Sequence, residues 1–189
     1  MTVNLDRYPL LASVQGARWD VAEVRFAFEL EPPLEELVAG VRCAGFSGGR
    51  VLVIDTEEFG RSAFPGGTLE PGEGWMQALE RELLEETGAR AVAVEVIGRI
   101  HFRSGADEPY RPHLPHPEFQ QVVAWAEVEI VGAPTNPPDG ERVLAVDLVP
   151  IDRAVELLRA ENPWEAELLC LVADLRRAGA AAPKVRWEG

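Results

Sequence analysis

The sequence predicts an α/β fold in which a mixed sheet lies between helical layers. Two observations point to it. Short segments that alternate apolar and polar residues are interleaved with segments of helical periodicity. With 189 residues, 47% of them hydrophobic and 26% charged, the chain has the size and composition of one globular unit. We expect an N-terminal extension over residues 1–35, a main domain over 36–180 and a C-terminal tail over 181–189.

The N-terminal extension is the least regular part of the sequence. Apolar and charged residues alternate from Trp19 to Leu30, which predicts a strand, and Pro32-Pro33 then breaks the chain. This segment could be an extra strand, a dimerisation arm or part of a substrate pocket. We favour an extra strand that packs on the domain or on the partner subunit of a homodimer.

Five further strands are expected in the main domain. Glycines 48 and 49 fit a hairpin turn between the first two of these strands. The later strands are rich in Val and Ile, which favour extended structure. The expected strands are residues 37–46, 50–55, 91–102, 120–131 and 141–149.

Two helices are expected near the C-terminus. Asp152 is placed to cap a helix that runs through Arg159. Asn162, followed by proline and, three positions on, by Glu165, predicts the start of a final helix over residues 163–178.

A third helix is expected between a glycine-rich loop and a terminating glycine, in the stretch from Gly66 to Ala89. Glu73 is expected in the first turn, where negative charge complements the helix dipole. Gly88 is placed for a left-handed C-terminal cap. One Met and two Leu residues form an apolar stripe that should pack this helix on the sheet.

The same helix carries three crowded carboxylates. At ~100° per residue, Glu82, Glu85 and Glu86 fall within an arc of about 100°. Like charges at this spacing cost roughly 0.2–0.5 kcal/mol per pair on an exposed helix, so the crowding indicates a neutralising partner. Hard divalent cations take oxygen ligands, and Mg²⁺ typically binds carboxylates together with substrate phosphates. For the helix considered alone, a solvated surface is the alternative explanation.

The spacing of this stretch resembles the signature of the Nudix hydrolases. The matching positions are Gly67, Glu73, Arg81, Glu82, Glu85, Glu86 and Gly88. Ala89 stands where the family pattern ends in an aliphatic residue. The resemblance extends more loosely over residues 38–160. It implies a Nudix-like α/β/α sandwich with a mixed sheet and a loop-helix-loop catalytic motif.

The resemblance also implies a metal-dependent nucleotide pyrophosphatase, an enzyme that acts on phosphoric anhydride bonds. Mg²⁺ or Mn²⁺ is the expected cofactor. Its ligands would be Glu82, Glu85, Glu86 and the backbone carbonyl of Gly67. Arg81 and Glu73 would hold these ligands in place.

The signature does not fix the general base. Glu82 is the first candidate. The second is an acid outside the signature, either Glu141 before the last strand or one of Glu127 and Glu118 near the preceding strand. Acids in such positions are more often ordinary surface residues.

One long irregular segment, residues 103–118, contains four prolines. Loops of this length in compact domains are usually functional or disordered. Arg103 and Arg111 could bind a phosphate, and Tyr110 or Phe119 could stack on a base. The alternative is a stiff surface loop whose aromatic rings pack against the protein.

Other chemistries find little support. The prolines around His113 and His116 exclude the helix that would bring both to one metal ion, and His101 is expected to be structural. The sequence contains no P-loop.

The net charge and the distribution of apolar residues exclude several classes of binding partner. A net charge of −14 argues against a nucleic acid duplex or a membrane surface, since both require clusters of Lys and Arg. No apolar run approaches the ~20 residues of a membrane span. Cys43 and Cys170 lack metal-ligand spacing and are expected to be free thiols in a reducing cytoplasm.

The expected partner is therefore a small nucleotide-type substrate. We favour a nucleoside diphosphate linked to another group, of the ADP-sugar type. A nucleoside triphosphate is the second choice. A Nudix-like domain that binds nucleotides as a non-catalytic sensor is a further alternative, although a pure binder has no need for three unneutralised acids.

Overall fold

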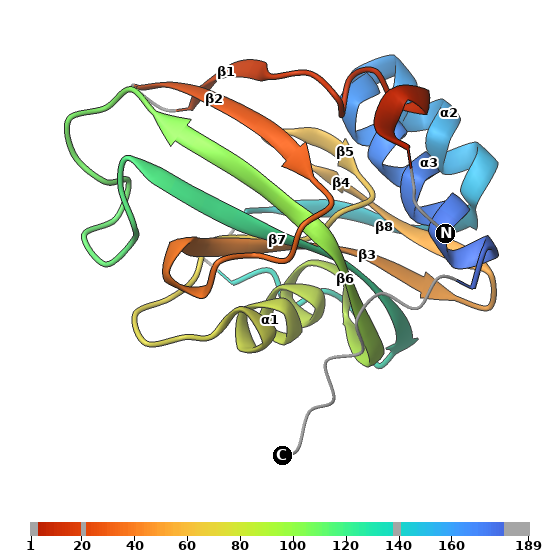
Figure 1. The fold of residues 1–189 in the computed structure, drawn as a ribbon. Coiled ribbons are helices and arrows are strands. Elements are labelled where there is room, and N and C mark those ends of the chain that lie inside the picture. The colour runs from red at the N-terminus through yellow and green to blue at the C-terminus, as the bar shows by residue number, and fades with distance from the viewer. Residues whose placement is uncertain (1–3, 20–21, 138–140, 180–189) are drawn as a thin grey trace.

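The computed structural model describes residues 4–19, 22–137 and 141–179 and confirms the α/β architecture. An eight-stranded mixed sheet lies between helices (Figure 1). Helix α1 (Trp75–Thr87) covers one face. Helices α2 (Ile151–Glu161) and α3 (Pro163–Arg177) cover the other. The predicted three layers are thus present.

The strands run in the order β1-β2-β6-β7-β3-β4-β5, and β8 also pairs with β4. Only the β3–β7 pair is parallel among the described strands. The strands are β1 (Gln15–Trp19), β2 (Ala22–Glu29), β3 (Val38–Ser47), β4 (Arg50–Thr56), β5 (Gly60–Ser62), β6 (Ala89–Ser104), β7 (Glu118–Ile130) and β8 (Val143–Pro150).

The N-terminal segment forms two strands where the sequence predicted one. β1 pairs with β2, and β2 pairs antiparallel with β6, so that both extend the sheet. The side chains of Val24 and Phe28 in β2 are buried. Further upstream, the hydroxyl of Tyr8 donates a hydrogen bond to Asp174 of α3 at 2.6 Å. The segment is therefore packed onto the sheet and α3, while the division of the chain at residues 35 and 180 stays a prediction.

Two turns lie where the sequence placed them. Gly48 and Gly49 join β3 to β4 with φ angles of 56° and 79°. Gly88 ends α1 with a φ of 64°, and a Cβ there would lie 2.3 Å from the carbonyl oxygen of Gly132. Side chains are excluded at Gly88 by both conformation and space. The side chain of Asn162 caps α3 by accepting a hydrogen bond from the amide of Glu165.

Two helix starts differ from the prediction. α1 begins at Trp75, so Glu73 precedes the helix instead of lying in its first turn. The reason is that the side chain of Gln77 accepts a hydrogen bond from the amide of Gly74 at 2.9 Å and caps the helix. Glu73 instead accepts a hydrogen bond from Arg81, eight residues further on. α2 begins directly after β8, so Asp152 lies inside its first turn and is not the cap.

Alternating residues of β3 face two separate cores. Val41 and Cys43 pack toward Leu83 of α1. Phe46 packs toward Leu168 of α3. Burying a large apolar side chain contributes roughly 1.5–3 kcal/mol, so the two cores hold the sheet and both helical layers together.

Candidate active site

The glycine-rich loop, residues 65–74, is hydrogen bonded along strand β3. The amide of Val41 donates to the carbonyl of Gly67 at 3.0 Å, and the amide of Cys43 donates to the carbonyl of Pro65 at 2.9 Å. A Cβ on Gly66 would lie 2.1 Å from the carbonyl oxygen of Val41. The close approach therefore requires glycine at position 66 and fixes the loop between the sheet and α1.

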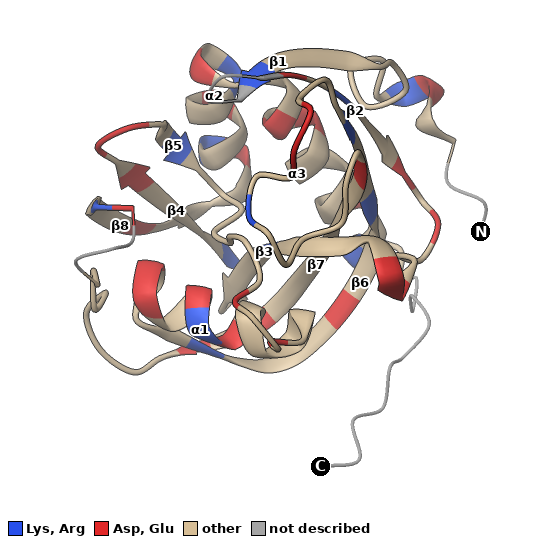
Figure 2. Cartoon of the chain, turned by 90° about the vertical axis from the view of Figure 1, so that its left-hand side faces the viewer, with Lys and Arg blue, Asp and Glu red and all other residues tan. Residues whose placement is uncertain are grey.

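Two glutamates of helix α1 reach this loop, and Figure 2 shows the acidic bands of α1 interrupted by a basic one. Glu86 is 6% exposed and accepts a hydrogen bond from the amide of Gly66 at 2.8 Å. Arg81 contacts Glu82 at 2.7 Å and Glu85 at 3.4 Å. The structure thus brings Glu82 and Glu86 to the loop, while Glu82 and Glu85 share one counter-ion.

Arg81 joins the loop to the helix. It forms a bidentate pair with Glu73, at 2.9 and 3.0 Å, and donates to the carbonyl of Thr68 at 3.1 Å. The hydrogen bond with Glu73 is the main reason that the pKa of Arg81 is raised above its ordinary value. Arg81 is therefore a permanent cation that pairs with both Glu73 and Glu82, while its role in holding metal ligands stays a prediction.

Glu86 lies in a strongly acidic environment. Burial raises its pKa to about 8, and the negative charges of Glu82 and then Glu141 act in the same direction. Oε1 of Glu141 is buried and has no hydrogen-bond partner in the described part of the chain. Of the candidate bases outside the signature, Glu141 therefore lies at the acid cluster, defined here as Glu82, Glu86 and Glu141.

The other two candidate bases lie in ion pairs. Glu127 pairs with Arg176 of α3. Glu118 pairs with Arg103 at 3.0 Å and lies 3.7 Å from His101. Both acids therefore have counter-ions of their own.

Within residues 4–19, 22–137 and 141–179, no three His, Cys, Asp or Glu side chains are gathered closely enough to hold a metal ion. The donors are nevertheless of the type that Mg²⁺ or Mn²⁺ takes, since all are oxygens and one, in Glu141, is buried without a partner. A Cβ on Gly67 would lie 2.2 Å from Oε1 of Glu82, so glycine is needed for the carboxylate to lie this close to the loop. The oxygen donors of the site therefore fit a hard cation. That Glu85 joins Glu82 and Glu86 as a ligand stays a prediction.

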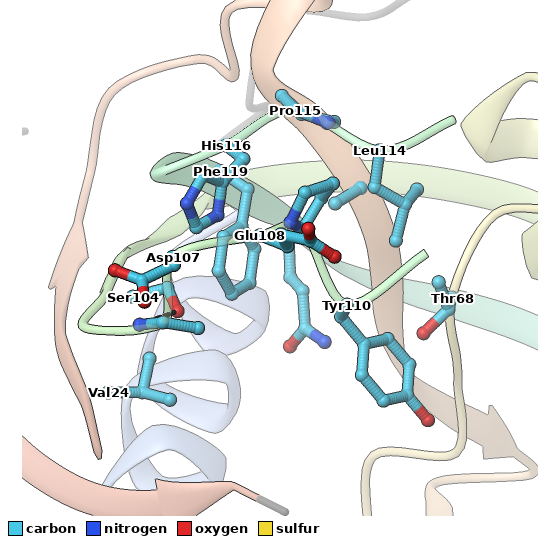
Figure 3. A pocket seen from close by; sticks show the side chains of 14 residues that line it. Val24, Thr68, Ser104, Asp107, Glu108, Tyr110, Leu114, Pro115, His116 and Phe119 are labelled. Carbon is cyan, nitrogen blue, oxygen red and sulfur yellow. Dashed lines mark hydrogen bonds between the residues drawn. The ribbon is translucent and has the colours of Figure 1, made fainter. Parts of the chain in front are cut away.

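A cavity of about 400 Å³ lies beside the glycine-rich loop (Figure 3). Apolar and aromatic side chains form much of its wall. Figure 3 shows Tyr110 and Thr68 on one side and Val24, Ser104 and Asp107 on the other. The lining residues are Val24, Ala39, Thr68, Ser104, Ala106, Asp107, Glu108, Pro109, Tyr110, Leu114, Pro115, His116, Phe119 and Gln121.

The predicted substrate contacts divide into two groups. Tyr110 and Phe119 line the cavity, with Tyr110 58% exposed and Phe119 stacked on Phe102 at a ring separation of 4.9 Å. Arg103 and Arg111 do not line it. Arg103 pairs with Glu118, as described above, and Arg111 pairs with Glu70 at 3.2 Å.

The proline-rich loop, residues 105–117, is bound to the glycine-rich loop. Nε2 of His113 lies 2.8 Å from the carbonyl oxygen of Leu69, and Leu114 packs against the core under α1. His116 lines the cavity. The two histidines therefore have different surroundings, and His113 fixes the proline-rich loop to the glycine-rich loop.

Two polar residues near the site were not singled out from the sequence. Nε of Arg42 in β3 donates to Oε1 of Gln121 in β7 at 3.1 Å. Gln121 lines the cavity and is 7% exposed. Arg42 is the one charged residue in the ten of β3, and this was the signal available in the sequence.

The comparisons with known proteins agree with this architecture. The NUDIX domain model matches residues 36–172 of the chain. No curated protein matches the sequence.

Several solved structures share the fold. A mutant of the Bacillus subtilis pyrophosphohydrolase BsRppH is 19% identical, with a TM-score of 0.58 over 84% of this chain and 94% of that one. A NUDIX hydrolase from Nitrosomonas europaea is 21% identical, with a TM-score of 0.52 over 81% of this chain and 93% of that one. An ADP compounds hydrolase is 14% identical, with a TM-score of 0.53 over 90% of this chain and 95% of that one.

Proposed function

Because this chain belongs to the NUDIX family of hydrolases, which act on phosphoric anhydride bonds, we propose that it cleaves the pyrophosphate bond of a nucleoside diphosphate linked to another group. An ADP-sugar type of substrate is favoured, with Mg²⁺ or Mn²⁺ as cofactor. The observation that carries the proposal is that one short loop borders both the acid cluster and the cavity. Gly67 lies against Glu82, and the next residue, Thr68, lines the cavity.

The cation would be held by Glu82, Glu85, Glu86 and the Gly67 carbonyl, with Glu141 as a further oxygen donor. When bound, such a cation neutralises the diphosphate and lowers the pKa of water. Arg81 keeps the carboxylate of Glu82 in position through their 2.7 Å contact. The oxygen of the attacking water bonds to phosphorus while Glu82 or Glu141 accepts the proton of this water. The bridging oxygen then leaves with the electron pair of the cleaved P–O bond.

The cavity suits the nucleoside end of this substrate. Tyr110 and Phe119 present aromatic rings, and stacking one base on such a ring is worth ~1–3 kcal/mol. The carboxylates of Asp107 and Glu108 also line the cavity and disfavour a phosphate there. The phosphates therefore belong outside the cavity, on the side of the acid cluster.

A panel of pyrophosphate substrates assayed with Mg²⁺ and with Mn²⁺, with products separated by chromatography, tests this proposal. We expect ADP-sugar type compounds to have the highest kcat/KM and chelation by EDTA to abolish turnover. A preference for nucleoside triphosphates would favour the triphosphate pyrophosphohydrolase alternative. Binding without turnover of any compound would indicate the nucleotide sensor.

Two observations bear on the cellular location. No helix in the described residues is long and apolar enough to cross a membrane. Cys43 and Cys170 are both free thiols. A cytoplasmic location, a homodimeric assembly and the absence of nucleic acid or membrane partners stay predictions from the sequence.

A further inference from the structure

Arg42 lies at the junction between the acid cluster and the cavity. On one side its Nε donates to Gln121, a residue of the cavity wall, at 3.1 Å. On the other side Gly66, whose amide binds Glu86, is packed so closely that a Cβ on it would lie 2.9 Å from the Cα of Arg42. Arg42 therefore borders both the cavity wall and the loop that is hydrogen bonded to the acid cluster.

The guanidinium of Arg42 has donors to spare. Its other partner in the described part of the chain is Glu165 of α3, at 3.8 Å. Glu165 is already hydrogen bonded to the hydroxyl of Ser62 and the amide of Ala63, both at 2.7 Å. An arginine carries five N–H donors, and the Arg42 side chain is 38% exposed, so most of its donors are available to a ligand.

The other arginines near the site are committed elsewhere. Arg81 is occupied by three glutamates and a backbone carbonyl. Arg103 and Arg111 pair with acids and lie outside the cavity wall. The described residues of the wall itself include two carboxylates and no Lys or Arg. Arg42 is thus the cation best placed for a phosphate that adjoins the cavity.

We propose that Arg42 binds the phosphate attached to the nucleoside, so that the diphosphate spans from Arg42 to the acid cluster while the nucleoside occupies the cavity. This inference rests on the proposed function and adds the orientation of the substrate. Planar guanidinium groups match phosphate oxygens in bidentate geometry. Glu165, buried at 2% exposure, is a positioning residue that keeps Arg42 directed toward the junction.

Calorimetric titration in Mg²⁺ with three probes tests the orientation. The probes are adenosine, methylenediphosphonate, and the adenosine methylenediphosphonate in which CH₂ replaces the bridging oxygen and blocks hydrolysis. We expect Arg42→Gln to weaken both phosphonate probes about 10- to 100-fold, the scale of a hydrogen bond to a charged group, and to leave adenosine within about twofold. Arg42→Lys should recover part of the loss, since it keeps the charge without the planar fork.

The control is Arg153→Gln on α2, which removes an exposed arginine paired only with Glu156 among the described residues and should change no affinity. Unchanged phosphonate binding by Arg42→Gln would overturn the inference. So would a parallel loss of adenosine binding, because that would mean that the cavity had been disrupted through Gln121. If the wild-type protein binds no probe and hydrolyses no pyrophosphate, the proposed function fails as well. Wild-type hydrolysis combined with unaltered Arg42→Gln binding refutes the orientation alone.

Discussion

The acid cluster and the cavity share the glycine-rich loop but are built in opposite ways. The cluster is polar, and two of its carboxylates come from consecutive turns of α1. The cavity is mostly apolar, and its wall draws on residues from 24 to 121. The difference indicates a division of labour. Changes in the cluster should abolish hydrolysis of every substrate, whereas changes in the cavity should reorder substrates.

The largest effect is expected for Glu86→Gln. The substitution removes a buried carboxylate proposed to bind the cation, so turnover should fall about 100-fold or more on all substrates. The metal-free protein should keep its fold and its melting temperature should not fall, since Gln has a similar size, keeps an oxygen that can accept from the amide of Gly66, and carries no buried charge. Steady-state assays at limiting Mg²⁺ and circular dichroism measure the two effects.

Glu80→Gln is the matched control, because Glu80 is an exposed acid on the same helix. It should leave turnover unchanged. Near-wild-type activity of Glu86→Gln at limiting Mg²⁺ would remove Glu86 from the ligand set.

Tyr110→Ala should have the next largest effect, and only on substrates with a base. Loss of one stacking contact predicts a fall of about 5- to 150-fold in kcat/KM on the best nucleotide. Metal affinity and melting temperature should stay nearly constant, because the side chain is 58% exposed. Tyr110→Phe retains the ring and should retain activity. Equal kcat/KM values for the Ala and Phe variants would contradict stacking of the base on the ring of Tyr110.

Removing Arg103 and Arg111 together should have a smaller effect. Both guanidinium groups lie in exposed ion pairs, which are worth about 0–1 kcal/mol, so the fold should not depend on them. We expect KM to rise a few-fold or the substrate ranking to shift, with kcat preserved. A loss of kcat/KM larger than that caused by Arg42→Gln would indicate that the phosphate binds to the arginines of the proline-rich loop and not to Arg42 in β3.

A change outside both regions should alter stability alone. The pKa of Tyr8 is raised to about 12, first by burial and then by its hydrogen bond to Asp174. The neutral phenol is therefore favoured by folding. Its contribution is fully present below pH ~10 and is lost as the pH rises through about 12.

Tyr8→Phe should lower the free energy of unfolding by about 0.5–1.5 kcal/mol near neutral pH. The difference from the wild type should shrink in strongly alkaline solution. Urea titrations across this pH range measure both effects. A changed kcat/KM for the Phe variant would contradict the separation between the active site and the N-terminal contact.

Most of the acid cluster could be predicted from the sequence, because its glutamates on α1 and the loop beside them are close together in the chain. Gly67, Glu82 and Glu86 are brought together by one loop and one helix, whose periodicity and capping signals lie within the same stretch. Glu141 was anticipated only as one of several acids, since it follows Glu86 by 55 residues and no local pattern brings the two together.

The cavity and Arg42 could not be derived in the same way. Arg42 meets Gln121, 79 residues away, only because β3 and β7 pair in parallel. The contribution of Val24 depends on β2 joining the edge of β6. Strand order and register are decided by packing across the whole sheet, and no local pattern in these segments encodes them.

Hydrolysis of an ADP-sugar in heavy-oxygen water tests the central claim most directly. Water is expected to attack phosphorus, so mass spectrometry should find the label in one phosphate-bearing product and none in the bond to the sugar carbon. The reaction should require Mg²⁺ or Mn²⁺ and should be lost in Glu86→Gln. Label on the sugar carbon, or hydrolysis that persists in Glu86→Gln at the wild-type rate, would contradict pyrophosphate cleavage at the acid cluster.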